Sequence, residues 1–496
     1  MTAFDSSLVP TGDILIGGEW RHGRGAVTPS RYPADQTLNA EIHMADAADA
    51  HDAVAAADAA WRRADWAGLK PHQRAGVLYR IAELVNANHE ALAQLQRRDN
   101  GKPINETRAL VTSAANTFRY FAACAETLDD ELTPPRGDYL TMSVHEPLGV
   151  VAAITPWNSP IASDAQKLGP ALAAGNAVVL KPAEATPLAS LALARLCERA
   201  GVPRGVLSVI PGKGSVIGDA LVRHPLVKKV SFTGGTDVGR GIARLAADKL
   251  MPVSLELGGK SPTIVFDDAD LDHAVNGVLF GIFSSSGESC IAGSRLFVQR
   301  SIYDTFVARL VEGARRLRVG DPASERTQMG PLISGAHRES IERYVALGRD
   351  EGGRVLCGGE RPVGEDRERG FFYLPTILDG LHNHARICRE EIFGPVLVAM
   401  PFDDEASLIA DANDSVFGLA AGIWTRDYPR AWRVARALDV GTVWINTYKQ
   451  FSISTPFAGW KESGMGREKG RLGIREYLRQ KSLYWGLNDA PLPWAN

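Results

Sequence analysis

The 496-residue chain has few cysteines, and their spacing excludes two kinds of structural cross-link. The five are Cys124, Cys197, Cys290, Cys357 and Cys388. Their number is odd and no two of them have the spacing of zinc ligands, so neither a disulfide framework nor a zinc site is indicated. We therefore expect no bound metal, and thiols that stay reduced in a cytoplasmic location.

The sequence also lacks the features that mark nucleic-acid-binding, membrane and secreted proteins. Lys and Arg number 55 against 58 Asp and Glu, which gives a net charge of −3 and no basic field for nucleic acid. No apolar run reaches the length of a membrane span, because Pro, Gly or charge interrupts each one. Residues 1–10 lack the basic and apolar regions of a signal peptide. A cytoplasmic globular protein with about three domains is the expected class.

Strands and helices alternate along the middle of the chain. Residues 149–155 and 177–182 are apolar runs that end near proline, which is typical of strands buried on both faces. Further strands are predicted at 206–211 and 230–232, with helices ending near 174 and running from about 187 to 200. This alternation predicts parallel βαβ units in a doubly wound sheet, where ligands bind at the carboxyl ends of the strands.

The flanking regions have similar patterns, and we place a domain change near residue 257. Upstream we expect strands at 14–20 and 139–144, and helices at 45–63, 73–98 and 107–128. Downstream we expect strands at 263–266, 295–299 and near 399 and 443, helices at 303–317 and 335–352, and a surface loop at 359–370.

Two glycine patterns compete as a binding site for nucleotide phosphates. Residues 212–218 nearly match the dinucleotide fingerprint but have one residue too many, and a plain strand–turn–helix junction explains them equally well. Gly234 and Gly235 follow a predicted strand and open a helix, whose free amides favour a diphosphate. Asp237 is unfavourable to a phosphate but favourable to the helix dipole. Neither pattern alone establishes a nucleotide site.

Cys290 stands in a run of small residues, from Ser284 to Gly287 before it and from Ala292 to Ser294 after it. A thiol that attacks a substrate carbon needs such an uncrowded loop. Taken alone, the pattern is more often a buried free cysteine in a Ser/Gly turn, because free cysteine mostly behaves as a small hydrophobic residue. The assignment of Cys290 as a nucleophile depends on the other motifs.

Five separated motifs resemble those of the aldehyde dehydrogenase superfamily, in the same order. They are Thr155-Pro156-Trp157-Asn158, Lys181-Pro182-Ala183-Glu184, Glu256-Leu257-Gly258-Gly259-Lys260, the Cys290 loop and Glu390-Glu391-Ile392-Phe393-Gly394-Pro395. Cys290 follows Glu256 by 34 residues, which also resembles the family. The resemblance implies an α/β fold with two doubly wound α/β domains and a small β oligomerisation arm.

The resemblance implies an NAD-dependent oxidation of an aldehyde to its acid. Cys290 would attack as a thiolate, so its pKa must be lowered locally. The Asn158 amide and the Cys290 N–H would hold the oxyanion that develops. Glu256 would activate the water that cleaves the resulting thioester, with its pKa kept near the working pH by desolvation. Lys167 and Glu468 match family positions near a proton-relay path.

The family's cofactor positions carry over to this chain. Lys181 and Glu184 would hold the adenine ribose, and a carboxylate there favours NAD over NADP, although Lys213 could tolerate the 2′-phosphate of NADP. Glu391 would bond the nicotinamide ribose, with the Phe393 ring beside it. The other implied contacts are Thr155, Pro156, Trp157, Gly214, Gly234, Gly235, Val238 and Leu257.

Departures from the family pattern point to the substrate. Ser285 and Glu288 replace the common Asn and Gln before the cysteine, and small or polar residues (Ser159, Ser163 and Gln166) replace bulky tunnel residues. Trp157, Phe451 and Phe457 match aromatic tunnel positions. We expect a larger, polar or carboxylate-bearing aldehyde, attracted by Lys449 at the mouth of the tunnel. A solvated surface lysine is an equally good interpretation of Lys449.

The resemblance divides the chain into three parts: an NAD-binding domain (1–128 and 148–256), a catalytic domain (257–470) and a bridging arm (129–147 and 471–496). The arm, with its apolar strand Ser482–Trp485, implies a homodimer or homotetramer. Three other functions stay open. A CoA-acylating semialdehyde dehydrogenase would tend to lack Glu256, a non-catalytic binding protein would have lost Cys290 or Asn158, and an esterase would need no NAD.

Overall fold

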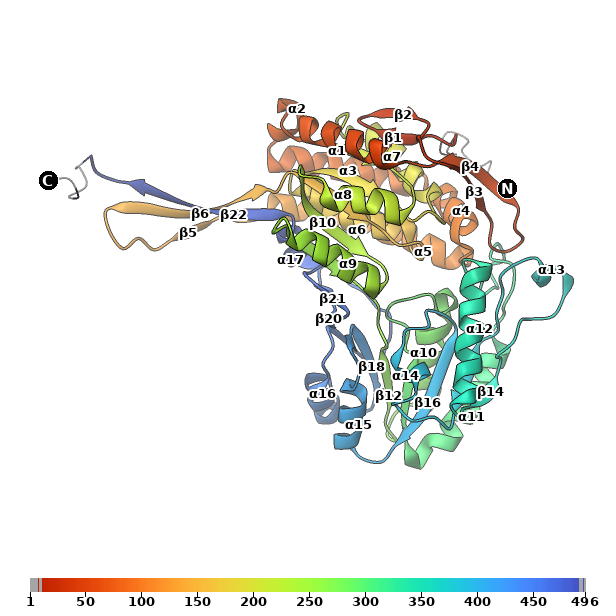
Figure 1. Cartoon of the computed structure of the whole chain (residues 1–496). Helices are drawn as coiled ribbons and strands as arrows, with labels where there is room; N and C mark the ends of the chain where they lie inside the picture. Colours follow the sequence, from red (N-terminus) through yellow and green to blue (C-terminus); the bar gives the residue numbers. More distant parts are fainter. Residues whose placement is uncertain (1–7, 9–10, 490–493, 495–496) are drawn as a thin grey trace.

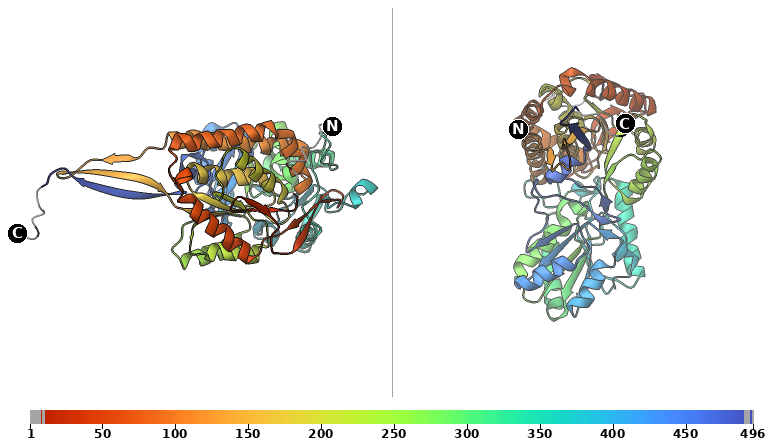
Figure 2. Two further views of the ribbon diagram at one scale, coloured as in Figure 1. Left: turned by 90° about the horizontal axis from the view of Figure 1, so that it is seen from above. Right: turned by 90° about the vertical axis from the view of Figure 1, so that its left-hand side faces the viewer.

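The computed structural model describes residues 8, 11–489 and 494 (Figure 1). Residues 1–7, 9 and 10, where no signal peptide is predicted, lie outside the described residues, as do 490–493, 495 and 496 at the end of the predicted arm. The described strands form two large sheets and a projecting arm, and helices cover both sheets (Figures 1 and 2). The predicted α/β fold with two doubly wound sheets and a β arm is confirmed.

The first sheet has eight strands in the order β2-β1-β9-β8-β7-β10-β11-β21. The strands from β9 to β11 run parallel, while β1, β2 and β21 pair antiparallel. The strand order reverses at β7, which is where such sheets bind ligands. The bounds are β1 Ile14–Ile16, β2 Glu19–Arg21, β7 Val150–Ile154, β8 Ala177–Lys181, β9 Leu207–Val209, β10 Val227–Thr233, β11 Val253–Glu256 and β21 Gly464–Met465.

Strand β7 explains the continuous apolar runs in the middle of the sequence. Val151 and Ala153 belong to the hydrophobic core on one face of the sheet, whereas Val150, Ala152 and Ile154 belong to the core on the other. Because both faces are covered by helices, each residue of the strand is buried. The helices around this sheet are α1 Ala47–Trp61, α2 Ala64–Ala67, α3 Pro71–Ala87, α4 His89–Asn100, α5 Ile104–Glu126, α6 Pro160–Ala173, α7 Leu188–Arg199, α8 Asp219–Arg223, α9 Thr236–Ala247 and α17 Gly470–Arg475.

The second sheet has seven strands in the order β14-β15-β16-β13-β12-β18-β19, parallel except for β14. Its strands are β12 Pro262–Val265, β13 Arg295–Gln299, β14 Arg354–Cys357, β15 Thr376–Asp379, β16 Val396–Phe402, β18 Ala420–Trp424 and β19 Thr442–Ile445. Its helices are α10 Leu271–Phe283, α11 Tyr303–Arg316, α12 Gly335–Asp350, α13 Glu365–Glu368, α14 Arg386–Arg389, α15 Glu405–Asn413 and α16 Tyr428–Ala437. The chain passes from one sheet to the other between β11 and β12, near the predicted residue 257.

The arm is a three-stranded sheet that projects from the body of the molecule (Figure 2). Its strands are β5 Glu131–Thr133, β6 Tyr139–Pro147 and β22 Leu478–Gly486, with β6 between the other two. Two further antiparallel pairs are β3 Val27–Arg31 with β4 Leu38–His43, and β17 Phe417–Gly418 with β20 Trp460–Lys461. Within the described part of the chain, each helix is too short or too polar to cross a membrane.

Three of the sequence predictions about secondary structure are wrong in detail. The expected strand 14–20 is a hairpin, because Gly17 and Gly18 take left-handed φ values of 61° and 86° and turn the chain. The expected helix 73–98 breaks into α3 and α4 at Asn88. The expected loop 359–370 contains the short helix α13.

Candidate active site

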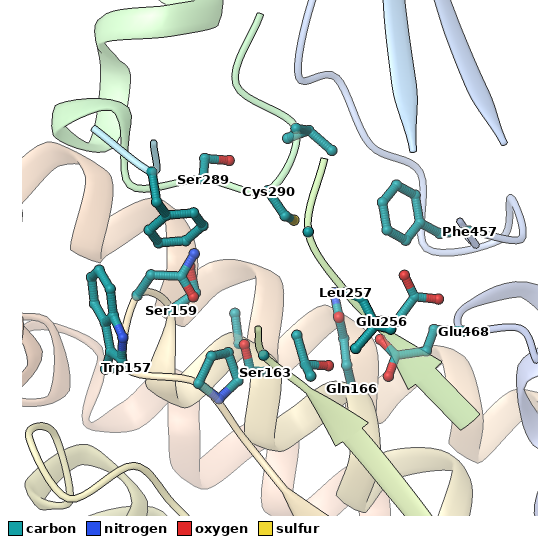
Figure 3. Close-up of a pocket in the computed structure, with 18 of the residues that line it drawn as sticks. Trp157, Ser159, Ser163, Gln166, Glu256, Leu257, Ser289, Cys290, Phe457 and Glu468 are labelled. Atoms are coloured by element: carbon teal, nitrogen blue, oxygen red, sulfur yellow. The ribbon is translucent and has the colours of Figure 1, made fainter. Parts of the chain in front are cut away.

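A cavity of about 450 Å³ is lined by segments of both sheets (Figure 3). Several lining segments directly follow the carboxyl ends of β7, β10 and β11, which is where the sequence predicts a ligand. The lining residues predicted from the sequence are Pro156, Trp157, Asn158, Ser159, Ser163, Gln166, Gly234, Gly235, Glu256, Leu257, Cys290, Glu391, Phe393, Phe451, Phe457 and Glu468. The structure therefore brings together most of the predicted catalytic, nicotinamide-side and substrate residues.

The turn before Cys290 explains the small residues around it. Ser285 and Ser286 have φ values of 58° and 54°, a left-handed conformation that is unusual outside glycine. Glu106 on α5 holds this turn, since its carboxylate accepts from the Ser285 N–H over 2.8 Å and from the Ser285 hydroxyl over 2.7 Å. A side chain at Gly287 would collide with the backbone of Gly394. The small residues therefore allow the backbone conformation that places the Cys290 thiol in the cavity.

The Cys290 thiol does not have the lowered pKa that the sequence argument requires. The enclosing cavity walls and the nearby carboxyl groups of Glu391 and Glu256 raise the pKa of the Cys290 thiol to about 12, against a smaller opposing effect of Lys449. Burial acts because a thiolate loses more hydration than a thiol does. The thiol is therefore protonated at neutral pH in this structure, and the expectation of a lowered pKa is wrong for it.

Glu256, the last residue of β11, has one carboxyl oxygen without a hydrogen-bond partner among the described residues. The residue is 5% exposed, and among the described residues nothing hydrogen-bonds its Oε2. Burial and the neighbouring Glu468 raise the pKa of Glu256 well above its usual value. A carboxylate with a raised pKa that faces a cavity is a stronger base than an exposed one.

Glu468 lies beside Glu256 (Figure 3). It is also the first member of a buried chain of hydrogen-bonded polar side chains. Lys167 donates from its Nζ to Glu468 Oε1 over 2.7 Å and to the Ser231 hydroxyl over 3.0 Å. Tyr477 in turn donates to the Ser231 Oγ over 3.0 Å. Glu468 therefore joins the cavity to a hydrogen-bonded path, although Lys167 does not itself line the cavity.

Asn158 is positioned to offer an amide N–H to the cavity. Its Nδ2 donates to the carbonyl oxygen of Glu288 over 3.0 Å, and this uses one of the two N–H groups of the amide. Among the described residues no second acceptor bonds this amide nitrogen, so its other N–H is available to a ligand in the cavity. Asn158 and the backbone N–H of Cys290, which lies against its own sulfur, are thus candidate oxyanion donors.

Glu288, at the position where the family resemblance leads us to expect Gln, is buried. Its Oε1 accepts from the Ile333 N–H over 2.9 Å, and burial raises the pKa of Glu288 to about 8 despite the nearby charge of Lys102. It does not line the cavity. Its described contacts are those of a residue that positions the Cys290 loop.

Glu391, Phe393 and Trp157 form one wall of the cavity. The Gly259 N–H donates to Glu391 Oε1 over 3.0 Å, and burial raises the pKa of Glu391 to about 7. The rings of Trp157 and Phe393 meet edge to face at 5.3 Å. His337, which was not predicted from the sequence, packs edge to face against Trp157 at 5.5 Å and bonds the Phe393 carbonyl oxygen over 2.8 Å.

Five predicted cofactor residues lie outside the cavity wall, near the carboxyl ends of the first sheet: Thr155, Lys181, Glu184, Gly214 and Val238. These residues differ in burial and in hydrogen bonding. Lys181 is buried and donates to the Pro182 carbonyl oxygen over 3.0 Å, whereas Glu184 is exposed on the next turn. Thr155 donates to the buried Asp164 over 2.7 Å.

The start of helix α9 is open to an anion. Gly235 caps the helix without a side-chain hydrogen bond, and a Cβ placed there would meet no atom within 4 Å. Asp237 pairs with Arg240 at 2.6 Å, which offsets the charge that made Asp237 unfavourable to a phosphate. Within residues 212–218, Gly214–Gly218 form a π-helical turn before α8.

The predicted substrate residues Trp157, Ser163, Phe451 and Phe457 all line the cavity, but Lys449 does not. Its Nζ donates to the Ser284 hydroxyl over 2.7 Å, so it supports the loop before the cysteine.

The sequence analysis missed further lining residues, among them Leu110, Ser113 and Lys469. Leu110 and Ser113 are three residues apart on α5, a helical spacing that was visible in the sequence. Lys469 directly follows the predicted Glu468.

The combined arrangement suits covalent catalysis on a carbonyl compound. A thiol, an amide donor and a carboxyl group with one unpartnered oxygen line the same cavity. These are the nucleophile, oxyanion donor and base of such a reaction. No group of three or more potential metal ligands occurs among the described residues.

Comparisons with known proteins point the same way. The family model described as "Aldehyde dehydrogenase family" matches residues 20–483. The chain is 40% identical over 485 residues to betaine aldehyde dehydrogenase of Bacillus subtilis (strain 168), covering 97% of this chain and 99% of that protein. It is 42% identical over 487 residues to betaine aldehyde dehydrogenase of Mesorhizobium japonicum, covering 98% of this chain and 99% of the relative.

Two solved structures are also similar across nearly the whole chain. One is betaine aldehyde dehydrogenase from Staphylococcus aureus in complex with NAD+, with a TM-score of 0.96, 37% identity and coverage of 98% of this chain and 97% of that one. The other is the NAD+ complex of an aldehyde dehydrogenase from Bacillus cereus, with a TM-score of 0.94, 40% identity and 96% coverage of both chains.

Proposed function

The chain belongs to the aldehyde dehydrogenase family and is an enzyme of that family; from this premise we propose that it oxidises an aldehyde to the carboxylic acid with NAD, through intermediates bonded to Cys290. The observation that carries the proposal is the convergence of Cys290, Asn158 and the Glu256 carboxyl, with its one unpartnered oxygen, on one cavity. The described free cysteines suit a reducing compartment, and a cytoplasmic location is part of this proposal.

The residues present fit NAD. The uncapped start of α9 suits the diphosphate, and Lys181 and Glu184 suit the adenine ribose. Glu391, with one carboxylate oxygen held by Gly259, suits the nicotinamide ribose beside the Phe393 ring. When bound there, NAD supplies the hydride acceptor that turns a thiohemiacetal on Cys290 into a thioester.

The protein's own groups would perform the remaining steps. The Cys290 thiol loses its proton to solvent, and its Sγ as thiolate bonds to the aldehyde carbon, while the second N–H of Asn158 and the Cys290 N–H hold the oxyanion. After hydride transfer, Glu256 takes a proton from water, which cleaves the thioester and releases the acid. Glu468, which lines the cavity beside Glu256, and Lys167, which donates to it, suit the transfer of that proton away from Glu256.

Hydrolysis by water is favoured over transfer to CoA because a buried carboxylate with a raised pKa stands in the cavity. An esterase role is the alternative, and NAD reduction separates it from the proposed reaction. The hydroxyl and amide groups of Ser113, Ser159, Ser163 and Gln166 on the cavity wall favour a larger, polar or carboxylate-bearing aldehyde. We place NAD binding in 1–128 and 148–256, catalysis in 257–470, and oligomerisation in 129–147 and 471–496.

The function is tested by NADH formation, followed by absorbance, with aliphatic, aromatic and carboxylate-bearing aldehydes. We expect turnover with NAD for at least one class, and a lower rate with NADP because the Glu184 carboxylate would repel a 2′-phosphate. Absence of NAD reduction with all three classes would contradict the proposal, and turnover only in the presence of CoA would favour the acylating alternative.

We also propose that the arm joins copies of this chain. Tyr484 and Trp485 on β22 are 73% and 67% exposed, and an exposed apolar strand is an association site unless it is covered. We expect a wild-type mass that is a multiple of 53.5 kDa in light scattering, and a smaller species for Trp485→Lys combined with Tyr484→Lys. The same substitutions at Tyr428 and Trp432, also exposed but on α16, are the control. A monomeric wild type would refute the proposal.

A further inference from the structure

Lys469 places an ammonium group inside the candidate active site. The residue lines the cavity together with Cys290, and only 7% of its surface is exposed. It precedes helix α17 with a left-handed φ of 58°, an unusual conformation for a residue with a side chain. The fold therefore holds this lysine in the wall of the cavity and away from bulk solvent.

Two aromatic rings face the ammonium group. Lys469 Nζ lies 3.6 Å from the centroid of the Phe451 ring and 5.2 Å from that of Phe457. These rings supply a cation–π attraction, which partly replaces lost hydration. Among the described residues, no carboxylate lies within ion-pair distance of Lys469 Nζ, although Glu468 and Glu256 act on it from farther away.

An enclosed ammonium group without a counterion is energetically costly, so it favours an anionic partner. Burial lowers the pKa of Lys469 to about 8, which still leaves most of it protonated at neutral pH. The nearby hydroxyl and amide groups of Ser113, Ser163 and Gln166 line the same cavity and can bond oxygen atoms of a ligand.

The same geometry disfavours a quaternary ammonium substrate. Such cations are recognised by the faces of aromatic rings. Here the Lys469 ammonium already lies over the Phe451 face, so a second cation would meet a like charge in an enclosed space. Several relatives of this chain are named betaine aldehyde dehydrogenases, and betaine aldehyde carries a quaternary ammonium group.

We propose that Lys469 is the specificity-determining residue of this enzyme, which binds the carboxylate of a carboxylate-bearing aldehyde and excludes aldehydes with a quaternary ammonium group. The proposal rests on the proposed function and replaces Lys449, the lysine suggested by the sequence, because Lys449 bonds Ser284 and does not line the cavity.

The test compares three aldehydes of different charge: 4-oxobutanoate, its methyl ester, which is neutral, and betaine aldehyde, which is a cation. For the wild type we expect kcat/KM to be about tenfold or more higher for 4-oxobutanoate than for the ester, the effect of a hydrogen bond between charged groups. We expect Lys469→Met to abolish this ratio and Lys469→Glu to invert the order of 4-oxobutanoate and betaine aldehyde. Lys449→Met is the matched control, and it should keep the wild-type ratio.

The outcomes separate this inference from the proposed function. If no aldehyde reduces NAD, the proposed function fails. If the ester or betaine aldehyde is turned over as well as 4-oxobutanoate by the wild type, the enzyme is active but the inference is wrong, whether or not the variants fold. A ratio that survives in Lys469→Met, or that is lost in Lys449→Met instead, would also overturn it.

Discussion

Replacement of Cys290 by alanine is expected to abolish aldehyde-dependent NADH formation, with a loss of about a thousandfold or more. The substitution removes the sulfur that bonds the aldehyde carbon, and no other cysteine among the described residues lines the cavity. NADH absorbance at saturating aldehyde and NAD measures the loss. The variant should still unfold at a temperature close to that of the wild type, because Cys290 is only half-buried.

Cys357→Ala is the matched control, since Cys357 lies on the edge strand β14, is buried and does not line the cavity. It should keep wild-type kinetics. NADH formation by Cys290→Ala at a tenth of the wild-type rate or more would mean that another group attacks the aldehyde. It would also remove the basis for the covalent mechanism.

The raised pKa of the Cys290 thiol leads to a further prediction, about how its reactivity depends on pH. With a pKa of about 12, the thiolate fraction of the enzyme without ligands rises about tenfold for each pH unit between pH 7 and 9. Alkylation of Cys290 by iodoacetamide should therefore accelerate about a hundredfold over that range. A rate that is already maximal at pH 7 would show that the thiol is ionised in solution, contrary to the geometry of this structure.

A feature of the fold or the site could be predicted from the sequence when residues close together in the chain determine it. Buried strands such as β7 and the order of the motifs are local, so the sequence predicts the fold and the convergence on Cys290. The break at Asn88 and the turn at Gly17 are also local, but single residues decide them within otherwise regular patterns.

Features that depend on contacts between distant parts of the chain could not be predicted from the sequence. The choice between Lys449 and Lys469 depends on which side chain crosses to the Phe451 ring and which bonds Ser284. The thiol pKa depends on carboxyl groups that lie 34 residues before Cys290 and far after it in the chain. Neither spacing nor composition encodes the final orientation of such side chains.

The Glu256→Gln variant tests the second half of the reaction. Gln has nearly the same shape as Glu but cannot accept a proton from water, so thioester hydrolysis should slow about a hundredfold or more. Because Glu256 Oε2 has no hydrogen-bond partner among the described residues, the substitution breaks no described contact of that atom. Rapid-mixing kinetics should show a burst of NADH close to one per active site, followed by a slow steady state, and mass spectrometry should find the acyl group on Cys290.

The pH dependence follows from the direction of the Glu256 pKa. The base must be ionised to take a proton from water, and its pKa is raised by burial, so wild-type hydrolysis should fall as pH falls through this raised pKa. Glu256→Gln should lose that pH dependence. Glu462→Gln, at an exposed glutamate paired with Arg240, should keep both the rate and the wild-type pH profile. If Glu256→Gln shows neither a burst nor turnover, Glu256 acts before hydride transfer, as the acceptor of the thiol proton. The role of hydrolytic base would then belong to another group.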